Sequence, residues 1–118
     1  MGTVTSRNFN SPDELRTPPN AAVAVVGLGR EKVAQFRMEP GWRWSESVKP
    51  IAGTDSCQAA HLGYFVSGRM HVVMDDGSEQ DFGPGDFMAC PPGHDAWIIG
   101  DEPCVVLDWA AYSTYAKR

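Results

Sequence analysis

Turn-forming residues interrupt this chain so often that no long secondary-structure element fits between them. Asp76-Gly77 suits a type I′ hairpin turn, because both central positions of that turn need a positive φ. Gly83-Pro84-Gly85 and Pro91-Pro92-Gly93 mark two further turns. A crossover between parallel strands needs a dozen or more residues, and the stretches between these turns are shorter. The turns therefore predict antiparallel strands.

The segments between the turns have the composition and the alternation of short strands. Lys32 to Met38, for example, alternates polar with apolar residues and ends at Pro40-Gly41. The expected strands are 22–26, 32–38, 42–46, 57–67, 70–74, 79–82, 86–90, 96–99 and 104–109. Short strands at this spacing are typical of an antiparallel sandwich or barrel, so the predicted fold class is all-β. Residues 48–56 read as a loop.

One helical signal precedes the strands. Ser11 can cap a helix whose first turn holds Pro12, Asp13 and Glu14, and Pro18-Pro19 ends it, which predicts a short N-terminal helical turn. We expect a single domain over residues 1–118 with its core at about 22–109. The tail, 110–118, has no clear preference.

The charge pattern argues against nucleic acid as a partner. Ten Lys and Arg stand against fifteen Asp and Glu, a net charge of −5, and the basic residues are too scattered to neutralise a row of phosphates. Residues 1–10 lack the apolar stretch of a secretion signal. No segment approaches the ~20 apolar residues of a membrane helix. These features predict a cytoplasmic protein that does not act at a membrane.

The three cysteines are an odd number, widely spaced and without a Cys-x-x-Cys pair. Cys57, Cys90 and Cys104 are therefore expected to be free thiols, buried as small apolar side chains in a reducing compartment.

Two stretches resemble the paired motifs of the cupin family. Gly85, followed after five residues by Pro91-Pro92-Gly93, is similar to the front of the second cupin motif. His61, followed after six residues by Gly68, is similar to the end of the first motif, with His where the family has Glu. The resemblance covers roughly 25–109 and implies an antiparallel jelly-roll barrel whose interior is the working site.

The resemblance also implies a divalent transition metal in the barrel, although the ligand motifs are altered. The family's His-x-His pair falls near Trp44 and Glu46, and its last histidine falls at Ala96, with His94 two residues earlier. The remaining set is Glu46, His61 and His94, which suits Fe, Mn, Ni or Zn. The alternative is a barrel without metal, in which His94 points outward and His61 pairs with Glu46.

Four tryptophans supply wide apolar walls. The residues expected to line a pocket for a small molecule are Trp44, Phe65, Met88 and Trp97, with core packing as the alternative for Trp44. Trp42 and Trp109 are expected in the core or in a dimer interface.

Two further polar residues have simple interpretations. His71 is expected at a surface position on the sheet. Asp95 either orients the His94 imidazole or accepts hydrogen bonds from turn amides.

Three functions remain open at this stage, and no catalytic residue can be named. The first is a barrel that binds a small molecule, with or without a divalent metal. The second is a metal-dependent enzyme of dioxygenase, isomerase or lyase type, and the third is a structural or accessory subunit. The resemblance further implies a homodimer formed through edge strands, here near 22–26.

Overall fold

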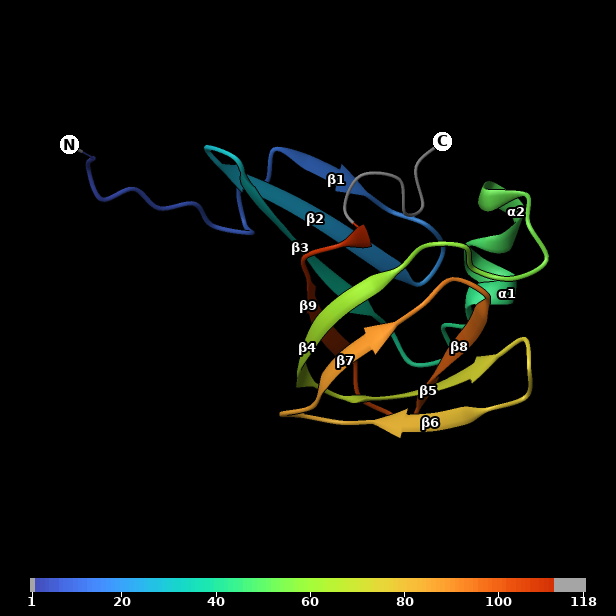
Figure 1. Cartoon of the computed structure of the whole chain (residues 1–118). Coiled ribbons are helices and arrows are strands. Elements are labelled where there is room, and N and C mark those ends of the chain that lie inside the picture. Colours follow the sequence, from blue (N-terminus) through green and yellow to red (C-terminus); the bar gives the residue numbers. More distant parts are fainter. Residues whose placement is uncertain (1, 112–118) are drawn as a thin grey trace.

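The computed structural model describes residues 2–111, which fold mainly into two antiparallel β-sheets (Figure 1). The larger sheet has the order β1-β2-β3-β9-β4-β7. Its strands are β1 (Glu14–Arg16), β2 (Ala21–Leu28), β3 (Glu31–Met38), β9 (Cys104–Asp108), β4 (His61–Ser67) and β7 (Phe87–Cys90). The smaller sheet, β6-β5-β8, consists of β6 (Glu79–Phe82), β5 (Arg69–Met74) and β8 (His94–Ile99). The all-β, antiparallel prediction is confirmed.

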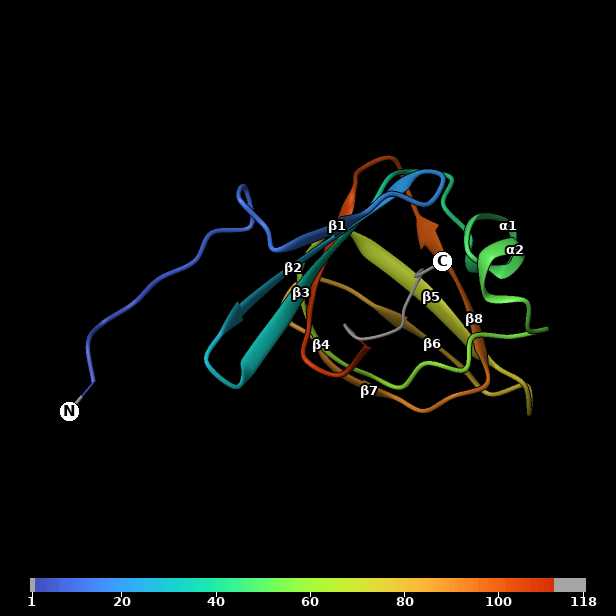
Figure 2. The same cartoon turned by 90° about the horizontal axis from the view of Figure 1, so that it is seen from above.

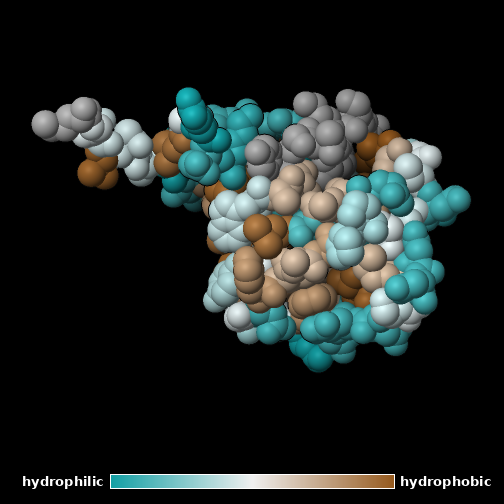
Figure 3. Space-filling view, in the orientation of Figure 1, coloured by the Kyte–Doolittle hydropathy of each residue, from teal (hydrophilic) through white to brown (hydrophobic). Residues whose placement is uncertain are grey.

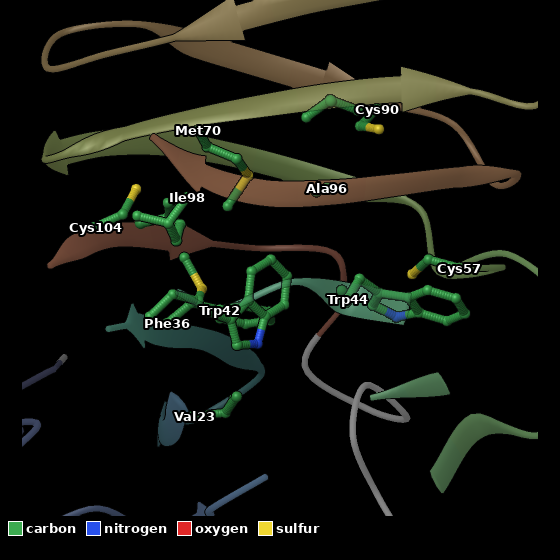
Figure 4. Packing of buried hydrophobic residues seen from close by; sticks show 14 of the residues in the cluster. Val23, Phe36, Trp42, Trp44, Cys57, Met70, Cys90, Ala96, Ile98 and Cys104 are labelled. Atoms are coloured by element: carbon green, nitrogen blue, oxygen red, sulfur yellow. The ribbon is translucent and has the colours of Figure 1, made fainter. Parts of the chain in front are cut away.

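The two sheets face one another and bury one side of most of their strands between them (Figure 2). In β8 every second residue is buried, and the same alternation runs along β9. The buried side chains meet in one apolar cluster that includes Phe36, Met70 and Ile98 (Figure 4). This alternation decides which side chains can reach the interior.

Residues 42–46, expected as a strand, instead begin a helical segment. Helix α1 (Trp44–Ser47) and helix α2 (Lys49–Ala52) follow β3. Trp44, Ser47 and Val48 are buried at spacings of three and four, which fits a helix and not a strand. The Asp95 carboxylate also accepts a hydrogen bond from the Ser45 amide at 3.1 Å. Neither α1 nor α2, the helices assigned between residues 2 and 111, is long and apolar enough to cross a membrane.

The predicted N-terminal helical turn is also wrong, because residues 14–16 form β1. Leu15 pairs with Ala24 of β2, so this segment satisfies its backbone groups in the sheet. Asp13 accepts a hydrogen bond from the Gly27 amide at 2.9 Å, which ties this carboxylate to β2. Strand β2 consequently lies between β1 and β3, and the prediction that 22–26 forms a sheet edge is wrong. Residues 112–118 of the predicted tail lie outside the described residues.

The predicted hairpin at Asp76-Gly77 forms between β5 and β6, but its turn type differs from type I′. Gly77 has a φ of +91°, whereas Asp76 is not among the positive-φ residues of the described chain. The Gly77 amide donates to the Met74 carbonyl at 2.9 Å. One left-handed residue, supplied by glycine, is therefore enough to reverse the chain here.

We predict that Gly68→Ala destabilises the fold more than Gly77→Ala. Gly68 has a φ of +75°, and a Cβ there would lie 2.4 Å from the Pro103 carbonyl oxygen, a backbone atom that cannot turn aside. At Gly77 nothing lies within 4 Å of the added Cβ. The expected loss in free energy of unfolding is about 1 kcal/mol for Gly77→Ala, from φ alone, and roughly 3 kcal/mol for Gly68→Ala. Urea unfolding measures both losses, and equal values would contradict a backbone clash at Gly68.

Candidate metal centre

Three potential metal ligands meet in the interior: Cys57, His61 and His94. One ligand atom from each lies within 4.8 Å of the others. His61 is the first residue of β4 and His94 the first residue of β8. Cys57 lies in the preceding loop, and its backbone pairs with that of His94, whose carbonyl accepts a hydrogen bond from the Cys57 amide at 2.7 Å. This bridge holds the thiol beside the imidazole.

His94 points into the interior, where it is 4% exposed. It precedes Ala96 by two residues, so strand alternation places both side chains on the same buried face. The alternative of an outward His94 is therefore wrong. Its Nδ1–H donates to the Pro91 carbonyl at 2.9 Å, and the Cys90 thiol lies 3.3 Å from the same nitrogen. This tautomer leaves the lone pair of the ring on Nε2.

The His61 ring is oriented by Asp108, the last residue of β9. Nδ1 of His61 lies 2.6 Å from Oδ2 of Asp108, whose side chain is 1% exposed. The other carboxylate oxygen accepts hydrogen bonds from the amides of Ala110 and Ala111, each at 2.8 Å. With Nδ1 as the donor, Nε2 carries the lone pair, and it lies 3.9 Å from the Cys57 sulfur.

Burial and hydrogen bonding set the charges of this group. Burial lowers the pKa of His94, and its neighbour His61 lowers it further. Burial raises the pKa of the Cys57 thiol to about 11. Burial also acts to raise the pKa of Asp108, but the hydrogen bond from His61 and the two backbone amides hold that pKa below its usual value. At neutral pH without metal, the group therefore contains a neutral His94, a protonated Cys57 and an ionised Asp108.

Glu46 is not part of this group. It lies on α1 and is exposed, because the helical segment turns it away from the face on which a strand would have placed it beside Trp44. The predicted pairing of His61 with Glu46 is wrong for the same reason, and Asp108 takes that place. Sequence reasoning missed Asp108, although its even spacing from Cys104 and Val106 along a predicted strand signals a buried carboxylate.

The three cysteines are free and buried, as predicted. Cys57 was expected to be only a small apolar side chain, and its closeness to His61 and His94 was not expected. The strand expected over 57–67 begins only at His61, so the prediction is wrong for residues 57–60 and strand alternation does not set the direction of Cys57.

An interior cavity adjoins the candidate ligands. The centre of a water molecule can occupy about 30 Å³ of it, enough for one or two waters or a few ligand atoms. Three of the four predicted pocket residues, Trp44, Phe65 and Met88, line this cavity together with His61, His94 and Asp108. Trp42, expected in the core or an interface, lines it as well.

The indole nitrogens of two cavity-lining residues, Trp42 and Trp44, have no hydrogen-bond partner between residues 2 and 111. The two side chains are 3% and 1% exposed. Figure 4 shows both rings, Trp44 near the Cys57 sulfur and Trp42 near Phe36. Buried N–H groups in proteins nearly always have an acceptor, so these two donors indicate an acceptor outside the described residues.

Trp97 does not line the cavity, and that prediction is wrong. Strand alternation in β8 places it on the opposite face from His94. There the Arg43 guanidinium lies 4.2 Å from the centre of its ring, and His71 packs against it with a centroid separation of 4.7 Å. Trp109 is 42% exposed, so its expected place in the core is wrong, and its place in an interface stays a prediction.

The outer side of the smaller sheet holds the two remaining polar residues. His71 lies at the predicted surface position, where its ring contacts Asp81 and Glu79. Asp95 accepts hydrogen bonds from the backbone amides of Ser45 in α1 and Ala96 in β8, and not from the turn amides that were expected.

Residues 53–110 match the family described as Cupin domain. A protein of unknown function from Rhizobium leguminosarum bv. viciae 3841 aligns with a TM-score of 0.64 and 19% identity over 92% of this chain and 97% of that chain. A sugar phosphate isomerase of the cupin superfamily from Silicibacter pomeroyi DSS-3 aligns with a TM-score of 0.61 and 20% identity, over 88% and 73%. The polyketide cyclase RemF from Streptomyces resistomycificus aligns with a TM-score of 0.61 and 19% identity, over 92% and 79%. No curated protein sequence matches. At these identities the solved structures show a common fold alone.

We predict that His94 and His71 of the metal-free protein titrate on opposite sides of pH 6.5, the ordinary histidine value. Burial lowers the pKa of His94, whereas the hydrogen bond to Asp81 raises that of His71. The neutral His94 contributes stability above pH 6.5, and this contribution is lost as the pH falls through the folded pKa. The His71 contribution is complete below pH 6.5 and is lost as the pH rises through its folded pKa. NMR titration of the ring protons measures both, and a His94 that titrates above His71 would contradict the burial argument.

Proposed function

This chain is a small cupin-domain protein, and we propose that its sheets form a jelly-roll barrel that binds a divalent transition metal together with a small molecule. The observation that carries the proposal is the approach of Cys57, His61 and His94 to within 4.8 Å in a buried site.

The donor set fits such a metal. One thiolate and two imidazoles are ligands that zinc, iron and nickel accept, and the soft sulfur disfavours manganese among the four metals expected from the sequence. Each imidazole uses Nδ1 to hold a fixed orientation, His61 on Asp108 and His94 on the Pro91 carbonyl, as metal-binding histidines commonly do. A metal with three protein ligands would offer an open position for Lewis-acid chemistry on a bound molecule.

The small molecule is supported by the two indole donors. An unsatisfied buried N–H costs about 1–3 kcal/mol, and Trp42 and Trp44 line the same cavity as His61 and His94, two of the three candidate ligands. A ligand with acceptor oxygens would satisfy them. Because the cavity is small, only a few atoms of the ligand would lie inside it.

A metal-dependent enzyme of isomerase, dioxygenase or lyase type is the second candidate. It is favoured by the three-ligand set, since catalytic metal sites keep a position open while structural sites close it with a fourth ligand. A purely structural subunit is disfavoured, because such a role needs neither the buried imidazoles nor the ionised Asp108.

We predict that the purified chain binds about one transition metal and that His61→Ala or Cys57→Ser abolishes this uptake. Cys57 has a pKa of about 11 without metal, so binding at neutral pH releases its proton. Elemental analysis by mass spectrometry gives the metal content. Reconstitution with Co²⁺ gives a thiolate charge-transfer band that the Cys57→Ser variant lacks.

The matched control is Glu46→Gln, which removes an exposed carboxylate of the predicted set and is expected to retain the metal. Circular dichroism establishes that each variant is folded. Metal retained by folded His61→Ala, or no uptake of Fe, Ni, Co or Zn by the unmodified chain, would contradict the metal site.

We also propose that the chain forms a homodimer through the outer face of β4 and β7. Leu62, Tyr64, Val66 and Phe87 are exposed apolar residues on this face, and Tyr64 pairs directly with Phe87. Figure 3 shows apolar surface over these strands. Strand β7 is also the edge of its sheet, and exposed apolar edges are commonly covered by a partner.

Phe87→Glu is predicted to give a monomer, because it places a charge in the centre of this apolar face. Leu15→Glu, on the opposite edge strand β1, is the matched control and is expected to leave the dimer intact. Light scattering at micromolar concentration distinguishes the two states, and a monomeric unmodified chain would refute the dimer.

A further inference from the structure

A groove lies where the two sheets meet without pairing. Strand β6 is an edge of the smaller sheet and β7 an edge of the larger one. Between them the surface is hollowed, and the centre of a water molecule can occupy about 360 Å³ of the hollow. Figure 3 shows a hollow with an apolar floor on this side of the molecule. This volume is in the range of small-molecule sites, whereas the interior cavity beside the candidate ligands is about a tenth as large.

Two side chains separate the groove from the interior. Val72 and Cys90 line both the groove and the interior cavity, and they are 5% and 6% exposed. The Cys90 sulfur lies 3.3 Å from Nδ1 of His94. The inner wall of the groove is therefore in contact with His94, a candidate metal ligand. Of the two spaces beside His94, the groove is larger than the interior cavity.

The groove has an apolar floor and an acidic rim. Met74 and Phe82 contribute to the floor, and Asp76 and Glu79 supply carboxylates at the rim. The described residues that line the groove include no Lys, Arg or His. Hydrogen bonds from the hydroxyl and the amide of Ser78 lower the pKa of Asp76, so this carboxylate is ionised at neutral pH. Glu79 also contacts His71, at 3.5 Å. A cationic group is attracted to this rim and an anionic group is repelled.

We propose that the groove between β6 and β7 binds the outer part of the ligand, a small molecule with an apolar body and a cationic group. This inference rests on the proposed function, in which the other end of the ligand carries acceptor oxygens into the interior. Cys90 and Val72 stand between the groove and the interior cavity, and the inner end of the ligand lies past these two side chains.

The rate at which the Cys90 thiol is chemically labelled measures occupancy of the groove, and this measurement needs no bound metal. The full chain, freed of metal by a chelator, is labelled with the neutral reagent methyl methanethiosulfonate, and peptide mapping gives the rate at Cys90. Benzyltrimethylammonium and benzenesulfonate have the same apolar ring and opposite charges. At about 10 mM the cation is expected to slow labelling at least about threefold, as for a millimolar dissociation constant, and the anion is expected to have no effect.

The double variant Asp76→Asn with Glu79→Gln removes the rim charges and is expected to lose this protection. Glu31→Gln with Asp101→Asn removes two charges elsewhere and is expected to keep it. Equal protection by the two aromatic probes, or protection by neither, would overturn the proposal. Metal uptake is measured separately, so a chain that binds metal without protection contradicts the groove alone, and protection without metal uptake contradicts the metal site alone.

Discussion

The candidate site depends on one buried carboxylate. Asp108 is 1% exposed, yet its pKa lies below the usual value because His61 and two backbone amides together occupy both of its oxygens. Breaking such a pair leaves an uncompensated buried charge, which costs several kcal/mol. Asp108 therefore holds the His61 ring in one orientation and one tautomer. It also links β9 to β4 at the end of the ladder where the candidate ligands lie.

Strand alternation explains how much of the site could be predicted from the sequence. The turns at Asp76-Gly77 and Pro91-Pro92-Gly93 define short strands. In such a strand every second residue faces inward, so one buried residue assigns the inward face. His61 was identified as a site residue through its resemblance to the end of the first cupin motif. His94 could be placed inward by strand alternation, because it lies two residues before Ala96. The turn that precedes it was an equally good reason to expect an outward side chain.

The parts of the site that could not be predicted lie where alternation does not apply. Trp42, Trp44 and Glu46 look like a strand locally, but burial of Trp44 with Ser47 and Val48 and the hydrogen bond from the Ser45 amide to Asp95 favour a helix. That tertiary contact turns Glu46 outward. Cys57 reaches the site through a backbone bridge to a residue 37 positions later in the chain, and no local pattern encodes such a pairing.

The two spaces of the proposed ligand site have opposite chemistry. The interior presents N–H donors from Trp42 and Trp44 and the ligand atoms for a cation, so it suits an electron-rich group. The groove presents Asp76 and Glu79 and suits a positive one. A molecule with both features can bind in only one direction, because reversal would set the cationic group beside a metal and the acceptor beside carboxylates. Orientation would thus be decided by charge, and the apolar walls formed by Val72 and Cys90 would contribute affinity without selecting a direction.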